Sequence, residues 1–170
     1  MRILGIDPGI ATVGFGVIDV SGAKTAHIAH GVIETPAGER LSLRLYNINK
    51  DVSELIRIYR PDEIAVEELF FNTNLTTGIS VAHGRSAAIL AGEAAGIPMY
   101  EYTPLEVKKA IAGYGRAEKP QVMEMTRRLL ALAAVPRPDD AADALAIALC
   151  HARHAGSGLA GLGAQVRKTI

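Results

Sequence analysis

Four acidic residues occupy positions where a folded α/β chain would bring carboxylates together. Asp7 and Glu67 each follow a short apolar run, and Asp140 and Asp143 open an alanine-rich segment. On a helix the last two share one face, because they are three residues apart. Crowded carboxylates repel each other unless a cation lies between them. The pattern therefore predicts a site for a hard divalent cation, Mg²⁺ or Mn²⁺.

Two such ions, about 4 Å apart, would activate a water molecule and stabilise the leaving oxygen during hydrolysis of a phosphodiester. No serine, cysteine or histidine nucleophile is then required, and His83, His151 and His154 are expected to be packing or surface residues. Basic residues crowd the stretch before the aspartates: Lys108, Lys109, Arg116, Lys119, Arg127 and Arg128. A basic rim beside an acidic centre suits a metal-dependent nuclease, because the rim holds phosphates. A solvated helical face is the alternative reading of the same charges.

Each acidic position also has an ordinary structural explanation. Aspartates are favoured at helix starts as caps, and the Asp-Pro-Gly sequence that begins with Asp7 is common turn chemistry. Gly14 and Gly16 favour a site, because they leave one face of the next strand bare and so mark the close approach of a ligand or a backbone. Strand alternation places Glu67 and Glu68 on opposite faces. We choose Glu67 as the ligand and Glu68 as its solvated neighbour.

The hydrophobic pattern predicts the elements that would position these residues. Expected strands cover 2–6, 12–20, 25–34, 63–66 and 99–102. Expected helices cover 40–59, 75–95 (with capping candidates at 72–74), 103–112, 120–134 and 139–154. This order predicts a mixed five-stranded α/β sheet, with three antiparallel strands followed by parallel ones, flanked by helices. Ligands bind at the carboxyl ends of parallel strands, so Asp7 and Glu67 would meet there if the first and fourth strands are neighbours.

Composition limits the remaining possibilities. The 170 residues, 49% of them hydrophobic, fit one compact domain, expected over 1–155, with a glycine-rich, disordered tail over 156–170. No apolar run is long enough for a membrane span and no secretory signal is evident, so we expect a cytoplasmic protein with no membrane partner. A formal net charge of zero argues against a protein that coats nucleic acid by bulk charge. The single cysteine, Cys150, excludes an intramolecular disulfide and a multi-cysteine zinc cluster.

Several segments, in order, resemble the bacterial RuvC Holliday-junction resolvases over roughly residues 1–154. They are Gly5-Ile6-Asp7-Pro8-Gly9, Ala65-Val66-Glu67 with Phe70 after it, Ala117-Glu118-Lys119, and the run 140–148. The resemblance implies an RNase H-like fold and a homodimer. It also implies Mg²⁺-dependent or Mn²⁺-dependent nicking of two opposed strands of a four-way DNA junction in recombination and repair. A branch-migration motor complex is a further expected partner.

The resemblance also implies roles for single residues. Asp7, Glu67, Asp140 and Asp143 match the family's four acidic positions, Lys108 and Lys119 are expected to contact phosphate near the cut, and Phe70 is expected to stack on a base. For Phe70 and Phe71 a hydrophobic staple of the next helix is the alternative, and one residue can serve each role. Phe71, Lys109 and Arg116 complete the expected DNA-binding set. Asp139 directly precedes Asp140, which departs from the family pattern; helical spacing favours Asp140 as the ligand.

Three other functions fit parts of the pattern. The segment 7–16 also resembles the phosphate-holding hairpin of ATP-binding proteins of the actin and sugar-kinase type, but those need two such domains. A non-catalytic junction-binding protein would not need the acids. A related nuclease acting on RNA would be distinguished by its substrate.

Overall fold

The computed structural model describes residues 1–68 and 75–156. Its five strands are β1 (Arg2–Asp7), β2 (Thr12–Ser21), β3 (Lys24–Glu34), β4 (Glu63–Glu67) and β5 (Met99–Tyr102). Its helices are α1 (Leu41–Tyr59), α2 (Leu75–Ala94), α3 (Pro104–Ala112), α4 (Lys119–Leu129) and α5 (Asp139–Gly156). The order is the one that the hydrophobic periodicity predicts.

The five strands form one mixed sheet in the order β3-β2-β1-β4-β5. Strands β1, β2 and β3 are antiparallel, whereas β4 runs parallel to β1 and β5 runs parallel to β4. Ile6 of β1 lies opposite Val66 of β4, so the first and fourth strands are neighbours. The predicted mixed sheet is confirmed, and Asp7 and Glu67 follow the last paired residues of adjacent parallel strands.

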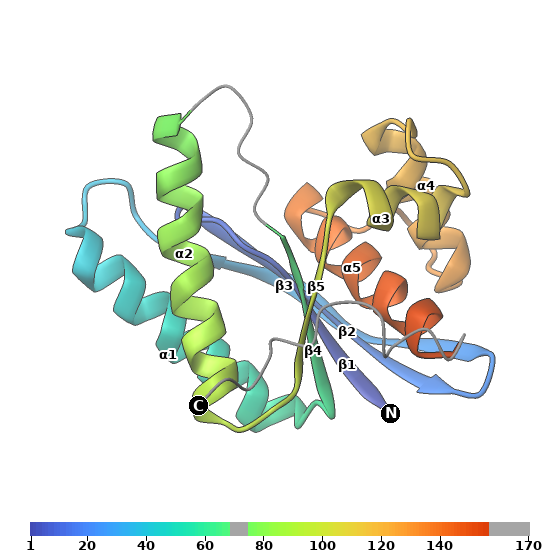
Figure 1. Ribbon diagram of the computed structural model, residues 1–170, viewed down its shortest axis with the longest axis horizontal. Helices are drawn as coiled ribbons and strands as arrows, with labels where there is room; N and C mark the ends of the chain where they lie inside the picture. Colours follow the sequence, from blue (N-terminus) through green and yellow to red (C-terminus); the bar gives the residue numbers. More distant parts are fainter. Residues whose placement is uncertain (69–74, 157–170) are drawn as a thin grey trace.

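Helices cover both faces of the sheet, with α1 and α2 on one side and α3, α4 and α5 on the other (Figure 1). Alternation along the strands divides the core accordingly. Ile6 and Val66 pack with α1 and α2, whereas Ile3 and Ala65 pack with α5. Because side chains alternate along a strand, Asp7 and Glu67 fall on the α5 face.

The ends of α3 follow the predicted capping chemistry. The Thr103 hydroxyl accepts from the Glu106 amide and the Glu106 carboxylate accepts from the Thr103 amide, which completes a capping box ahead of Pro104. Gly113 ends the helix with a φ of 87°, a left-handed conformation that glycine adopts without steric cost.

The prediction that α4 extends to about residue 134 is wrong. The helix ends at Leu129 because the chain turns there in a Schellman motif: the Leu132 amide donates to the Arg127 carbonyl and the Ala131 amide to the Arg128 carbonyl. Ala131 takes the left-handed position (φ 51°) where a glycine is usual, so the sequence carries no stop signal. The turn buries Leu130 in the core beneath α5.

None of the helices within the described residues is long and apolar enough to cross a membrane. Helix α5 continues to Gly156, and the rest of the tail expected over 156–170 lies outside the described residues.

Candidate active site

The site begins where β1 and β4 end. Asp7 and Glu67 are the last residues of these two parallel strands, and the register of the sheet brings the strand ends side by side. Both side chains are partly buried, while Glu68 is exposed. The structure thus places Glu67 and Glu68 as strand alternation predicts.

Helix α5 lies directly on glycines of the sheet. Gly14 pairs with Asp7 across β2 and β1, and a Cβ at Gly14 would stand 2.0 Å from the carbonyl oxygen of Asp140. A Cβ at Gly5 would stand 2.1 Å from the Ala144 carbonyl oxygen. The bare strand face therefore admits a backbone, and this contact carries the acidic start of α5 to the ends of the strands.

The first turn of α5 carries the other two acids. Asp140 and Asp143 lie three residues apart and thus on one face of the helix. The negative charge of each raises the pKa of Asp7. The Asp139 carboxylate is engaged by basic side chains: one oxygen accepts from Arg137 at 2.5 Å. Its second oxygen lies 3.8 Å from the ammonium of Lys119. The choice of Asp140 over Asp139 as a ligand stays a prediction.

Burial and an excess of negative charge raise the pKa values of the carboxylates in the site. Burial, followed by the charges of Glu67, Asp143 and Asp140, raises the pKa of Asp7 to about 8, against the opposing effect of Lys119. Burial and the charge of Asp143 raise the pKa of Glu67. Burial also raises the pKa of Asp143, although its bond with Lys119 opposes the rise. These carboxylates, drawn from three elements far apart in the chain, β1, β4 and α5, share one electrostatic environment.

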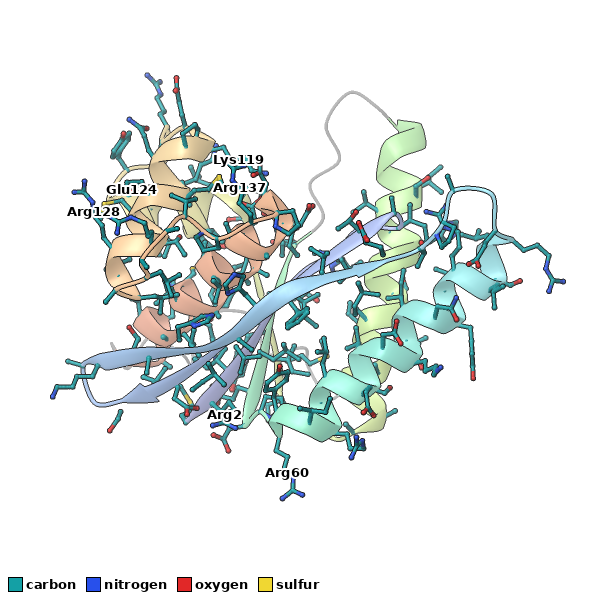
Figure 2. The ribbon with its side chains drawn as sticks, turned by 180° about the vertical axis from the view of Figure 1, so that it is seen from behind. Arg2, Arg60, Lys119, Glu124, Arg128 and Arg137 are labelled. Atoms are coloured by element: carbon teal, nitrogen blue, oxygen red, sulfur yellow. The ribbon has the colours of Figure 1, made fainter. Side chains whose placement is uncertain are left out.

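Two lysines reach this environment, as the resemblance implies. The Lys119 ammonium lies 2.7 Å from the Asp143 carboxylate. Burial of Lys119 disfavours its charge, but the bond to Asp143 and the charges of Asp143, Asp139 and Asp7 outweigh burial and raise its pKa. The pKa of Glu67 is raised overall, but the charge of Lys108, on α3, acts to lower it. The Lys108 ammonium therefore also faces the site. Figure 2 shows Lys119 and Arg137 together at the end of the molecule where α5 begins.

The carboxylates are near enough to perturb one another but do not yet share a coordination geometry. Within residues 1–68 and 75–156, no three acidic, histidine or cysteine side chains already stand as a metal cage. The Lys119 ammonium, paired with Asp143, supplies part of the positive charge that these carboxylates require.

Two arginines of the expected basic rim are engaged by groups of the chain itself. Arg127 donates to Glu124 and to the Leu132 carbonyl, and Arg128 donates to Glu124, so both guanidinium groups are bound within α4 and the turn that follows it. Lys109 and Arg116 are exposed, on α3 and on the loop before α4. Phe70 and Phe71 lie outside the described residues.

The histidines lie where the sequence predicts, in packing or surface positions. His83 is exposed on α2. His151 is fully buried, with Nδ1 2.7 Å from the Tyr102 hydroxyl and Nε2 2.6 Å from the Glu63 carboxylate. Burial raises the pKa of Cys150 to about 12, so its thiol stays protonated.

Sequence reasoning missed Arg85. Its Nε donates to the Glu67 carbonyl oxygen at 3.1 Å, and its Nη2 lies 2.7 Å from a Glu101 carboxylate oxygen, with the side chain only 13% exposed. The available signal was that Arg85 is the single lysine or arginine in the segment 75–94.

Comparison with known proteins identifies the family. The family model of "Crossover junction endodeoxyribonuclease RuvC" matches residues 3–151. The chain belongs to the RuvC family. Its curated RuvC relatives include those of Rubrobacter xylanophilus, 56% identical over 95% of this chain and 90% of the relative, and of Brevibacillus brevis, 56% identical over 90% and 92%.

Solved structures agree with this assignment. The RuvC of Thermus thermophilus in complex with a Holliday junction substrate superposes with a TM-score of 0.88 at 40% identity, covering 93% of this chain and 96% of that one. A yeast mitochondrial Holliday junction resolvase, 15% identical, shares the fold with a TM-score of 0.68. The predicted RNase H-like fold and the family resemblance are confirmed. As a RuvC member the chain is a metal-dependent crossover junction endodeoxyribonuclease.

Proposed function

We propose that Asp7, Glu67, Asp140 and Asp143 hold two divalent ions, Mg²⁺ or Mn²⁺, with which the chain hydrolyses one phosphodiester in each of two opposed strands of a four-way DNA junction. The observation that carries the proposal is geometric: Asp7 and Glu67 end adjacent parallel strands, and α5 rests on Gly14, so that the carboxylates of its first turn act on Asp7. A folded protein gathers such a group at an energetic cost that a bound cation removes.

The donor set fits a hard cation. All four proposed ligands are carboxylates, which Mg²⁺ and Mn²⁺ prefer to sulfur. The ion pair between Lys119 and Asp143 supports the fit, because it places a positive charge 2.7 Å from one of the proposed ligands. Since no three side chains of the described segments stand as a finished cage, the carboxylates would draw together on binding. When bound, the ions supply positive charge to the attacking water and the leaving oxygen of an in-line displacement.

The chain's own residues would orient the DNA around these ligands. Lys119 and Lys108 would each offer an ammonium to the phosphate at the cut, where negative charge develops. Lys109 and Arg116, being exposed nearby, would contact phosphates farther along the strand. Phe70 or Phe71 would stack on a base at the opened centre of the junction, a contact worth about 1–3 kcal/mol per base.

We also propose a homodimer, because paired cuts in two equivalent strands require two active sites related by a two-fold axis. The inner face of α2 is already covered, because Ala87, Ala88 and Ala91 pack into the chain's own core. The outer face of α2 instead exposes Ile79 and Leu90, at 49% and 63% of their surfaces, and this face is the proposed contact. A branch-migration motor complex is the proposed further partner, and the cytoplasm, where a bacterial chromosome lies, is the proposed place of action.

Cleavage of a synthetic four-way junction tests the proposed site. Wild type should nick the junction symmetrically with Mg²⁺ or Mn²⁺ and leave linear duplex uncut. Asp7→Asn should bind the junction but lose cleavage by about 1,000-fold or more, since it removes a ligand of the reacting centre. Asp51→Asn, on α1 and thus across the sheet from α5, is the matched control and should cleave normally. Cleavage by Asp7→Asn at the wild-type rate would remove Asp7 from the site.

A further inference from the structure

The inner face of α2 contacts the loop after β1 and the end of β4, the two strands that carry the central acids. Its two contact residues, Gly84 and Arg85, are adjacent in the sequence, so one turn of one helix reaches two separate parts of the candidate site. Neither residue belongs to the proposed ligand set, and neither is explained by core packing alone, because one lacks a side chain and the other is charged.

Gly84 touches the loop that follows Asp7. A Cβ at position 84 would stand 2.1 Å from the Gly9 carbonyl oxygen and 3.0 Å from the Ile10 amide nitrogen. The backbone of α2 therefore lies against the Asp-Pro-Gly turn, and this contact leaves no space for any side chain at position 84.

Arg85 holds the end of β4. Its Nε donates to the Glu67 carbonyl oxygen at 3.1 Å. Its Nη2 lies 2.7 Å from a carboxylate oxygen of Glu101, on β5, in an ion pair that lacks hydrogen-bond alignment. The Arg85 side chain is 13% exposed and the Glu101 side chain 28%, so solvent screens the pair less than it would screen a surface contact.

Arg85 and the Glu67 carboxylate lie on opposite faces of the sheet. Glu101 pairs with Val66, whose side chain packs toward α1 and α2, whereas the Glu67 carboxylate faces α5 and feels the charge of Asp143. Arg85 thus reaches Glu67 through its backbone only, from behind, and stays out of the space where substrate would lie.

We propose that Arg85 is a positioning residue for the reaction: by anchoring the Glu67 carbonyl and bridging to Glu101, it fixes where β4 ends and hence where the Glu67 carboxylate stands relative to Asp7. The inference rests on the proposed role of Glu67 as a ligand. A planar guanidinium suits this task because it presents several donors in a rigid fork, which one lysine ammonium cannot reproduce. Displacement of a catalytic group by about 1 Å can lower a rate about 100-fold.

The test compares Arg85→Met and Arg85→Lys with a matched control, Arg2→Met. Arg2 also bonds a carboxylate, that of Asp19, and a backbone carbonyl, that of Tyr59, but at the opposite end of the sheet (Figure 2). Each protein is assayed for its single-turnover cleavage rate at saturating junction, for junction affinity, and for the rise in melting temperature that Mn²⁺ causes without DNA.

For Arg85→Met we expect cleavage about 10- to 100-fold slower, a smaller Mn²⁺-induced rise in melting temperature and unchanged junction affinity. Arg85→Lys should recover part of both losses, and it provides the comparison if the methionine variant does not fold. Arg2→Met should lose stability while its cleavage rate and Mn²⁺ response stay at the wild-type level. Wild-type cleavage and Mn²⁺ response in folded Arg85→Met, or equal losses in Arg2→Met, would overturn the inference while leaving the proposed ligands intact.

Discussion

Gly14 of β2 lies against the carbonyl oxygen of Asp140 in α5, at a separation where an added Cβ would stand 2.0 Å from that oxygen. Gly14 also pairs with Asp7 across the sheet. One residue without a side chain therefore fixes the distance between the acid that ends the first strand and an acid near the other end of the chain. The geometry of the site depends on this contact as much as on the carboxylates.

Replacing Gly14 with alanine should lower both stability and cleavage. The new methyl group meets backbone rather than a flexible side chain, so α5 must move, and we expect a loss of about 3 kcal/mol in the free energy of unfolding. Urea denaturation measures that loss. Gly38→Ala is the control, since a Cβ there meets nothing within 4 Å. Equal stability of the two variants would show that α5 does not rest on Gly14.

Replacing Lys119 with methionine should slow cleavage about 100-fold, because it removes a cation aimed at the acidic centre. Junction affinity should fall much less, since other lysines still contact phosphate. Lys119→Arg should retain part of the cleavage rate. Lys50→Met, at an exposed position of α1, should retain all of it. A single-turnover assay at saturating junction separates rate from affinity. A full rate in Lys119→Met would exclude a role for this ammonium at the cut.

Replacing Asp7 with asparagine should stabilise the protein when divalent ions are chelated. The native pKa of Asp7, about 8, lies above the ordinary value of 3.8, so folding takes up a proton between these pH values. The native state is therefore progressively destabilised from about pH 4 to pH 8 and fully so above pH 8. We expect the variant to gain about 2–5 kcal/mol at pH 9 and little at pH 4.

Thermal unfolding of wild type and Asp7→Asn in EDTA at both pH values measures this gain. Asp51→Asn again serves as the control. A variant that is less stable than wild type at pH 9 would contradict the crowding of charges around Asp7.

Acid should destabilise the protein through His151. Burial lowers the pKa of this imidazole, although the bond and charge of Glu63 oppose the shift; Tyr102 bonds its other nitrogen and His154 lies nearby. The unfolded chain therefore binds a proton that the native protein does not, so stability is full above about pH 6.5 and falls as pH drops below it.

Urea unfolding of His151→Gln between pH 5 and pH 8 checks this origin. The variant should be about 1–3 kcal/mol less stable at pH 8, because buried partners lose their bonds, and its stability should fall less toward pH 5. His83→Gln, at an exposed position, should retain the wild-type slope. An unchanged slope in His151→Gln would assign the acid sensitivity to another group.

Local signals explain why most of the fold was predictable. Short apolar runs, the Asp-Pro-Gly turn and the Thr103 capping box each act over a few residues, and the order of strands then restricts which ends meet. The adjacency of Asp7 and Glu67 follows from that order. The bare strand face at Gly14 predicted a close approach, and the structure identifies the approaching group as the α5 backbone.

The missed features are long-range or lack their usual marker. Arg85 reaches β4 and β5 through the fold, and His151 meets Glu63 across 88 positions of sequence, so no local pattern reports either contact. The end of α4 has alanine at the left-handed position, where a glycine would have signalled the stop. By contrast, the pairing of Arg127 and Arg128 with Glu124 follows helical spacing of three and four residues and was predictable.

A crystal of the protein grown without divalent ions and then soaked in Mn²⁺ tests the central claim most directly, because anomalous scattering locates the ions without reference to activity. We predict two manganese peaks among the carboxylates of Asp7, Glu67, Asp140 and Asp143, and a loss of those peaks in Asp7→Asn crystals. Manganese bound only elsewhere, or four carboxylates that remain apart under saturating Mn²⁺, would contradict the account.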